Sequence, residues 1–229
     1  VLRWAKQCND RLIHALKELA NRVLGVQSYH LVLTCDEEQY THLEENHFYH
    51  FQMPSKPYIP WSGHYSLIKT EPQARIISAP VAFTALGMRT IAYRDAESPL
   101  LSIATELMEN LILHKEIREK GGAYGGGASY TPSTGNFHFY AYRDPHLQSS
   151  IDAFYLAIEK IGHQQFNERE LEEAKLGIIQ TLDAPVAPGN RAIVAYSWLR
   201  AGRTPALREE FRKAVIQAKS HEVAEAVQE

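Results

Sequence analysis

Residues 114–128 read HKEIREKGGAYGGGA, with five glycines between positions 121 and 127. An apolar helical pattern leads into this stretch, and an aromatic strand pattern leaves it. Glycine lets the backbone turn sharply or approach another backbone closely. The order of helix, glycine turn and strand therefore predicts a layered fold with a binding surface at the turn. Arg118 and Tyr124 are the two side chains placed to act there.

The helix before the glycines is predicted to run from Ser98 to about Lys120. Ser98 followed by Pro99 is a start signal, an N-cap and a first-turn proline. Gly121 and Gly122 are a stop signal. Between them apolar residues recur at helical spacing, namely Leu100, Ile103, Ala104, Leu107, Met108, Leu111, Ile112 and Ile117.

Two strands, 123–130 and 136–142, are predicted after the helix, joined by the turn sequence TPSTG at 131–135. Apolar and polar-tipped side chains alternate along the second strand, with Phe137, Phe139 and Ala141 interleaved with His138, Tyr140 and Tyr142. A long strand is also expected at 81–93, with a short one at 75–78 before it. This order predicts an α+β fold, a mainly antiparallel sheet with helices packed on one face.

The rest of the chain is predicted to be mostly helical. Before position 54 the pattern favours a helix at 2–24, a strand at 29–34 and a helix from Asp36 to about Phe48. Prolines at 54, 57, 60 and 72 suit neither a helix nor a central strand, so this stretch is interpreted as a surface linker. After the sheet, helices are expected at 147–161 and at 167–182, the second opened by an Asn167–Glu170 capping box. Two further helices follow, of which the second is opened by Thr204-Pro205, and another helix begins at 220.

Composition limits the classes of function. The 229 residues are 45% hydrophobic and 22% charged with a net charge of −3, typical of a soluble globular protein. The charge gives no case for a nucleic-acid or anionic-membrane partner, and no run of 18 apolar residues predicts a membrane span. Cys8 and Cys35 lie in apolar patterns, so we expect buried free thiols in a reducing compartment.

No local motif in the sequence supplies bond-breaking chemistry. Neither His-Glu-x-x-His nor His-x-x-Glu-His occurs, and His42 and His47 are five apart, which turns them away from each other on a helix. A Gly-x-Ser-x-Gly nucleophile elbow is also missing. A phosphate loop needs glycines before a helix, whereas here they follow one, at the negative end of its dipole.

The roles of Arg118 and Tyr124 have two possible interpretations. Both side chains can donate hydrogen bonds to a peptide carbonyl or an oxyanion. Alternatively, Arg118 only complements the C-terminus of its helix while Tyr124 packs on the sheet, and the glycines are simply a turn.

Residues 113–145 resemble the C-terminal half of the pitrilysin and insulinase-like zinc metallopeptidases, most closely the presequence protease branch. The similarity rests on HKEIREKGGAYGGGA followed by FHFYAYRDP, and it extends over most of 75–200. It implies a metallopeptidase-type α/β roll, in a clamshell whose N-terminal half carries zinc and whose two halves enclose unfolded peptides.

The resemblance also implies roles for residues of this chain. Arg118 and Tyr124 would hold the substrate carbonyl as it becomes an oxyanion, and the glycines would let an extended peptide approach the strand: Gly121, Gly122, Gly125, Gly126 and Gly127. The fragment itself would bind no metal and be inactive alone. Zinc would come from the N-terminal catalytic half, and the compartment would be a bacterial cytoplasm or an organelle matrix.

Applied to the whole chain, the resemblance predicts three parts. Residues 1–53 would end a preceding module, 54–73 would be the linker, and 74–229 would form most of the last roll, truncated at its C-terminus. Alternatively, the N-terminal helix and strand complete a single roll. The competing functional hypothesis is a catalytically inactive relative that acts as a structural or peptide-binding module.

Overall fold

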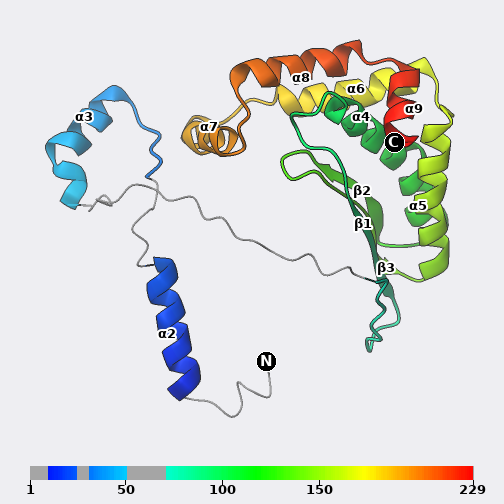
Figure 1. Ribbon diagram of the computed structural model, residues 1–229, viewed down its shortest axis with the longest axis horizontal. Coiled ribbons are helices and arrows are strands. Elements are labelled where there is room, and N and C mark those ends of the chain that lie inside the picture. Colours follow the sequence, from blue (N-terminus) through cyan, green and yellow to red (C-terminus); the bar gives the residue numbers. More distant parts are fainter. Residues whose placement is uncertain (1–9, 25–30, 51–70, 229) are drawn as a thin grey trace. The chain divides into compact units, whose positions relative to one another are not determined.

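The computed structural model describes residues 10–24, 31–50 and 71–228 (Figure 1). Predictions that fall on other positions lie outside the described residues: the first part of the 2–24 helix with Cys8, the start of the 29–34 strand, and most of the proline-rich linker. The chain divides into two compact units. One contains the residues before Ala74 together with Pro188–Ile193, and the other contains Ala74–Ala187 and Val194–Glu229.

The regular elements described in the first unit are helices and helical turns, and residues 31–36 form neither a helix nor a strand. Its elements are α2 (Asp10–Leu24), α3 (Glu37–Glu45), the short turn η1 (His47–His50) and the short helix η3 (Pro188–Asn190). Asp36 caps α3 as predicted, because its side chain accepts a hydrogen bond from the Gln39 amide at 2.7 Å. Within this unit the Ala192 amide donates to Thr34 Oγ1 at 3.2 Å.

The second unit is built on a three-stranded antiparallel sheet of order β1-β3-β2. Its strands are β1 (Ala82–Arg89), β2 (Gly125–Thr131) and β3 (Asn136–Asp144). The predicted hairpin is confirmed, because β2 and β3 pair from Thr131↔Asn136 to Gly125↔Tyr142. β3 lies in the middle and presents Phe137, Phe139 and Ala141 to the core.

Helices cover one face of this sheet, as predicted, and Figure 1 shows α4 and α5 on that side. The helices of this unit are α4 (Ser98–Met108), η2 (Glu109–Lys120), α5 (Leu147–Gly162), α6 (Glu168–Leu182), α8 (Pro205–Gln217) and α9 (Ser220–Gln228). A further helix, α7 (Arg191–Arg200), belongs to this unit from Val194 on. η2 packs on β2 and α5 packs on β1 and β3, while α6, α8 and α9 form an outer layer against α4 and α5. The core therefore lies between the sheet and the first helical layer and continues between the two helical layers, where Leu171, Phe211 and Val223 of the outer helices join it.

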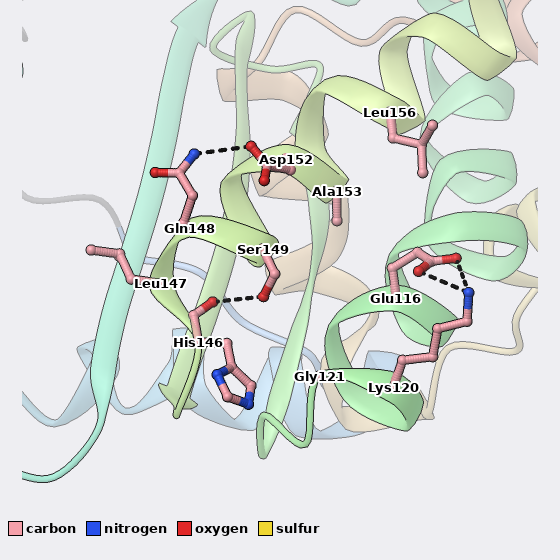
Figure 2. A pocket seen from close by; sticks show the side chains of 10 residues that line it. All are labelled: Glu116, Lys120, Gly121, His146, Leu147, Gln148, Ser149, Asp152, Ala153 and Leu156. Atoms are coloured by element: carbon pink, nitrogen blue, oxygen red, sulfur yellow. Dashed lines mark hydrogen bonds and ion pairs between the residues drawn. The ribbon is translucent and has the colours of Figure 1, made fainter.

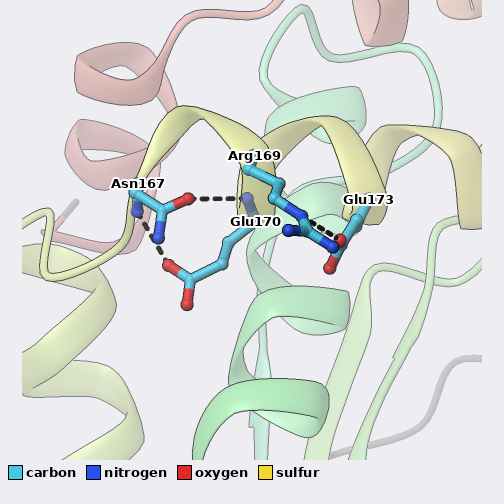
Figure 3. A network of polar contacts seen from close by, with 4 residues as sticks. All are labelled: Asn167, Arg169, Glu170 and Glu173. Carbon is cyan, nitrogen blue, oxygen red and sulfur yellow. Dashed lines mark hydrogen bonds and ion pairs between the residues drawn. The ribbon is translucent and has the colours of Figure 1, made fainter.

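The start of α6 shows how local sequence fixes an element (Figure 3). The Asn167 side chain accepts from the Glu170 amide at 3.0 Å, and the Glu170 carboxylate accepts from the Asn167 amide at 2.8 Å. In the same first turn, Arg169 Nε donates to Glu173 Oε1 at 2.9 Å. The predicted capping box is confirmed.

Several predictions are wrong in the described residues. Residues 31–34 and 75–78 form no strand, because neither stretch has a partner to complete a ladder within the described chain. β1 ends at Arg89, whereas the predicted strand ended at Tyr93, because the Thr90 and Tyr93 amides donate hydrogen bonds to carbonyls of the hairpin loop. α3 ends at Glu45, before the predicted Phe48, where the backbone enters positive φ.

Two side-chain predictions also fail. Ser98 starts α4 but does not cap it, because its Oγ bonds to the Tyr130 hydroxyl at 2.9 Å. Glu97 takes the N-cap position without a side-chain hydrogen bond. Cys35 is an exposed free thiol, although its apolar neighbours predicted burial, because Leu31 and Leu33 beside it are themselves exposed.

Candidate functional site

The helix that leads to the glycine turn changes its winding half-way. α4 is an ordinary α-helix, but it continues as η2, a π-helix of 12 residues. The Gly121 amide accordingly bonds to the Glu116 carbonyl, five positions back, at 3.0 Å. Likewise, His114 Nδ1 lies 3.4 Å from Glu119 Oε1, although residues five apart lie about 140° apart on an α-helix. π-helical turns are rare and occur often at functional sites.

The turn itself depends on two glycines. A Cβ on Gly121 would lie 2.6 Å from the Ile117 carbonyl oxygen, closer than real Cβ atoms come. Gly122 has φ +71°, in the left-handed region that favours glycine. The Ala123 amide then returns to the Ile117 carbonyl at 3.1 Å, and the chain enters β2. The predicted helix stop is confirmed.

The glycines of β2 make room for the chain's own atoms. A Cβ on Gly125 would lie 2.6 Å from the Tyr142 ring, and one on Gly126 would lie 2.6 Å from Ile117 Cγ2. One on Gly127 would lie 2.8 Å from a Glu109 carboxylate oxygen. Close packing on both faces of β2 is thus a reason for glycine that the sequence pattern alone did not reveal.

Arg118 and Tyr124 lie on opposite sides of the turn and are both exposed. Arg118 Nη1 lies 3.4 Å from His114 Nε2, one turn back on η2. Tyr124 is 64% exposed, and its ring centroid lies 5.6 Å from that of Tyr142. In the described part of the chain no hydrogen bond or cation–π contact joins the two side chains. Each therefore presents its donors to solvent beside the same turn.

Three residues that the sequence did not indicate lie near Tyr124 or along β2. The guanidinium carbon of Arg143 lies 5.3 Å from the centre of the Tyr124 ring. Beside Gly127 of β2, burial raises the pKa of Glu109, Glu106 raises it further and His114 opposes the change. Burial, followed by Glu109 and Tyr142, likewise raises the pKa of Tyr140. The sequence pattern that could have indicated Arg143 is Arg-Asp-Pro at the end of a predicted strand.

An open groove of about 700 Å³ borders the turn, between the end of η2 and the start of α5 (Figure 2). Its polar groups pair with one another. Lys120 Nζ lies 2.8 and 3.0 Å from the two Glu116 carboxylate oxygens, and Gln148 Nε2 donates to Asp152 Oδ1 at 2.9 Å. The remaining lining is Gly121, His146, Leu147, Ser149, Ala153 and Leu156. The groove therefore combines apolar side chains with two polar pairs whose members already bind each other.

Two general properties of the described residues also bear on function. Over 10–24, 31–50 and 71–228, no group of three or more His, Cys, Asp or Glu side chains is placed to hold a metal ion. Among the helices of the same residues, none combines the length and the apolar character needed to cross a membrane.

Comparison with known proteins identifies a matching family and similar sequences. Residues 77–228 match the family described as the PreP C-terminal domain. The mitochondrial presequence protease of Kluyveromyces lactis is 30% identical over 96% of this chain and 24% of its own length. That of Mus musculus is 36% identical over 60% of this chain and 13% of its own. The chain thus spans about a quarter or less of the curated relatives that it matches.

Solved structures share the fold at lower identity. A protease from Helicobacter pylori superposes with a TM-score of 0.63 at 14% identity, over 86% of this chain and 50% of its own. The peptidase M16 inactive domain from Pseudomonas fluorescens superposes with a TM-score of 0.58 at 17% identity, over 76% of this chain and 43% of its own. These similarities confirm the predicted metallopeptidase-type fold, and the family match covers most of the chain. The chain belongs to the PreP C-terminal domain family.

Proposed function

We propose that this chain is the substrate-binding, non-catalytic C-terminal part of a zinc metalloendopeptidase that degrades unstructured peptides such as presequences. In this proposal Arg118 and Tyr124 hold the substrate carbonyl, while the zinc belongs to the N-terminal half of the same protein. The relatives' names place them in mitochondria, in keeping with an organelle matrix as the compartment.

The observation that carries the proposal is the exposure of both side chains at one turn inside the family match. Arg118 ends η2 and Tyr124 precedes β2, and both lie within residues 77–228. Tyr124 keeps 64% of its surface although two neighbours contact its ring. A tyrosine whose only task was packing on the sheet would gain more by burial.

The chemistry assigned to the pair is electrostatic. Zinc, when bound by the N-terminal half, supplies the Lewis acid of the reaction. The described residues of this chain offer no ligand cluster that fits it. Arg118 contributes a permanent positive charge and Tyr124 a phenol donor, and both would stabilise negative charge that develops on the carbonyl oxygen.

The edge of β2 would hold the peptide backbone. β2 pairs with β3 on one side, and no strand of the described residues pairs with its other side. An extended peptide that added a strand there would gain main-chain hydrogen bonds with little demand on its sequence. This mode suits an enzyme that accepts many unstructured peptides.

The proposal is tested with Arg118→Ala and Tyr124→Phe in the full-length protein. We expect each variant to lose about 10²–10³-fold in turnover of an unstructured peptide, the usual effect of removing one oxyanion donor. Zinc content, measured by elemental analysis, should stay at the wild-type level. Because the lost interaction acts on the transition state, kcat should fall more than KM rises.

Matched controls are Lys115→Ala, an exposed cation on the same helix, and Tyr155→Phe, an exposed tyrosine on α5. Both should keep wild-type turnover. Wild-type turnover in both Arg118→Ala and Tyr124→Phe would remove these residues from the mechanism. A full-length sequence without His-x-x-Glu-His would instead favour the catalytically inactive relative.

A further inference from the structure

A β-bulge interrupts the pairing of β1 and β3 next to the candidate site. Ala82 pairs with Asp144 and Phe83 pairs with Tyr142, so Arg143 is the extra, unpaired residue. Bulges of this kind re-aim a side chain, and the residue in the left-handed conformation is usually glycine. Here it is an arginine with φ +50°.

Both sides of Arg143 are firmly anchored, so its conformation is imposed by its surroundings. Asp144 is buried, and its carboxylate accepts hydrogen bonds from Ser150 Oγ at 2.5 Å and from the His146 amide at 2.8 Å. On the other side, Tyr142 stays in register with both β1 and β2. The strand end and the start of α5 thus hold the bulge between them.

The re-aimed side chain lies over Tyr124. The Arg143 guanidinium carbon is 5.3 Å from the ring centre, within the range of a cation–π contact. The Arg143 carbonyl accepts a hydrogen bond from the Tyr124 amide at 3.4 Å, and the Tyr142 ring lies on Tyr124 at a tilt of 57°. The ring contacts of the exposed Tyr124 therefore come from the bulge and the residue before it.

The presence of arginine, and not glycine, at position 143 distinguishes a structural role of the bulge from a functional one. If the bulge served only to end β3, glycine would fill the left-handed position without strain. An arginine there adds strain to the fold and gains a contact with one side chain, Tyr124.

We propose that Arg143 is a positioning residue for Tyr124. Its guanidinium, carried by the bulge of β3, holds the ring so that the phenol is aimed at the substrate carbonyl. This inference rests on the proposed function, in which Tyr124 acts on that carbonyl.

The test uses Arg143→Gly and Arg143→Lys in the full-length protein. Glycine suits the left-handed position, so the variant should fold with no loss of thermal stability. We expect kcat to fall about two- to fivefold, the rate equivalent of an exposed cation–π contact, with KM unchanged. Lysine keeps the charge but not the planar group and should restore part of the loss. Arg75→Gly, an exposed arginine outside any helix or strand, is the matched control.

Coupling to Tyr124 distinguishes positioning from a general effect. In a Tyr124→Phe background, Arg143→Gly should cause no further fall in kcat, because the phenol that it positions is gone. An equal fall in both backgrounds would overturn the proposal, and so would unchanged kcat in Arg143→Gly alone.

A readout without activity separates this inference from the proposed function. With 3-fluorotyrosine at position 124 of the full-length protein, Arg143→Gly should shift the ¹⁹F signal, while a label at Tyr155 should stay unchanged. An unmoved signal at 124 overturns the positioning role whatever the function is. A shifted signal together with wild-type turnover in Tyr124→Phe would overturn the proposed function while leaving the contact in place.

Discussion

The two faces of β3 carry aromatic side chains in different surroundings. On the helix side, Phe137 and Phe139 are buried, and Phe139 stacks on Phe154 of α5 at 5.2 Å. On the open side, Tyr142 is 37% exposed and Tyr140 is half-buried. The buried rings are hydrocarbon, whereas the open ones have hydroxyl groups. One strand thus supports the core with one set of positions and provides polar-tipped rings near the glycine turn with the other.

The strongest test of this difference is Phe139→Ala. The side chain is fully buried between Phe137 and Phe154, so its removal leaves a cavity in the core. We expect the free energy of unfolding to fall by about 3–5 kcal/mol, measured by urea denaturation. Phe83→Ala, at a 59% exposed position paired with Tyr142 on the open face, should cost about 1 kcal/mol or less. Equal losses would mean that the open face also supports the fold.

A smaller effect is expected from Gly126→Ala on the helix side of β2. The new methyl group would meet Ile117 Cγ2 at 2.6 Å and the Tyr140 carbonyl oxygen at 3.0 Å. Overpacking of this kind costs about 1–3 kcal/mol, which thermal or urea unfolding would measure. Gly189→Ala, with nothing within 4 Å of the added carbon, is the control and should be nearly neutral. A stable Gly126→Ala that lost only peptide binding would assign this glycine to the substrate instead.

The smallest effect should come from Glu109→Gln, at a position whose carboxylate lies beside Gly127 of β2. Burial, aided by Glu106, raises the pKa of Glu109 above its ordinary value of 4.5. The folded state then binds this proton more tightly than the unfolded chain does, so stability falls as the pH rises from about 4.5 through the raised pKa. Glutamine cannot ionise, and the variant should lack this part of the decline in urea midpoints. Identical pH profiles would show that Glu109 titrates alike in both states.

Local signals explain which elements could be predicted from the sequence. The Asn167–Glu170 box and the 131–135 turn work through neighbours in the chain, and both are confirmed. The strands expected at 29–34 and 75–78 depend on a partner strand, which no local pattern can supply. Ser98 shows the same limit, since its hydroxyl bonds to Tyr130, which arrives from β2.

The candidate site divides in the same way. The glycine turn, with the exposed Arg118 and Tyr124 on either side of it, follows from residues 114–128 alone. The role that the resemblance gave to these two residues remains a proposal. Arg143 could not be placed beforehand, because its direction depends on a one-residue offset between β1 and β3. The packing reasons for Gly125 and Gly126 likewise appear only when β3 and η2 are in place.

The order of strands in the sheet has a consequence in chain entropy. β2 and β3 are joined by a short turn, so bringing them together costs little loop-closure entropy. β1 reaches β3 only across α4, η2 and β2, and its pairing carries the larger cost. The bulge at Arg143 exists only where β1 and β3 pair. The orientation of Arg143 therefore depends on the β1–β3 pairing, which has the larger loop-closure cost. Tyr124, in contrast, directly precedes the local β2–β3 hairpin.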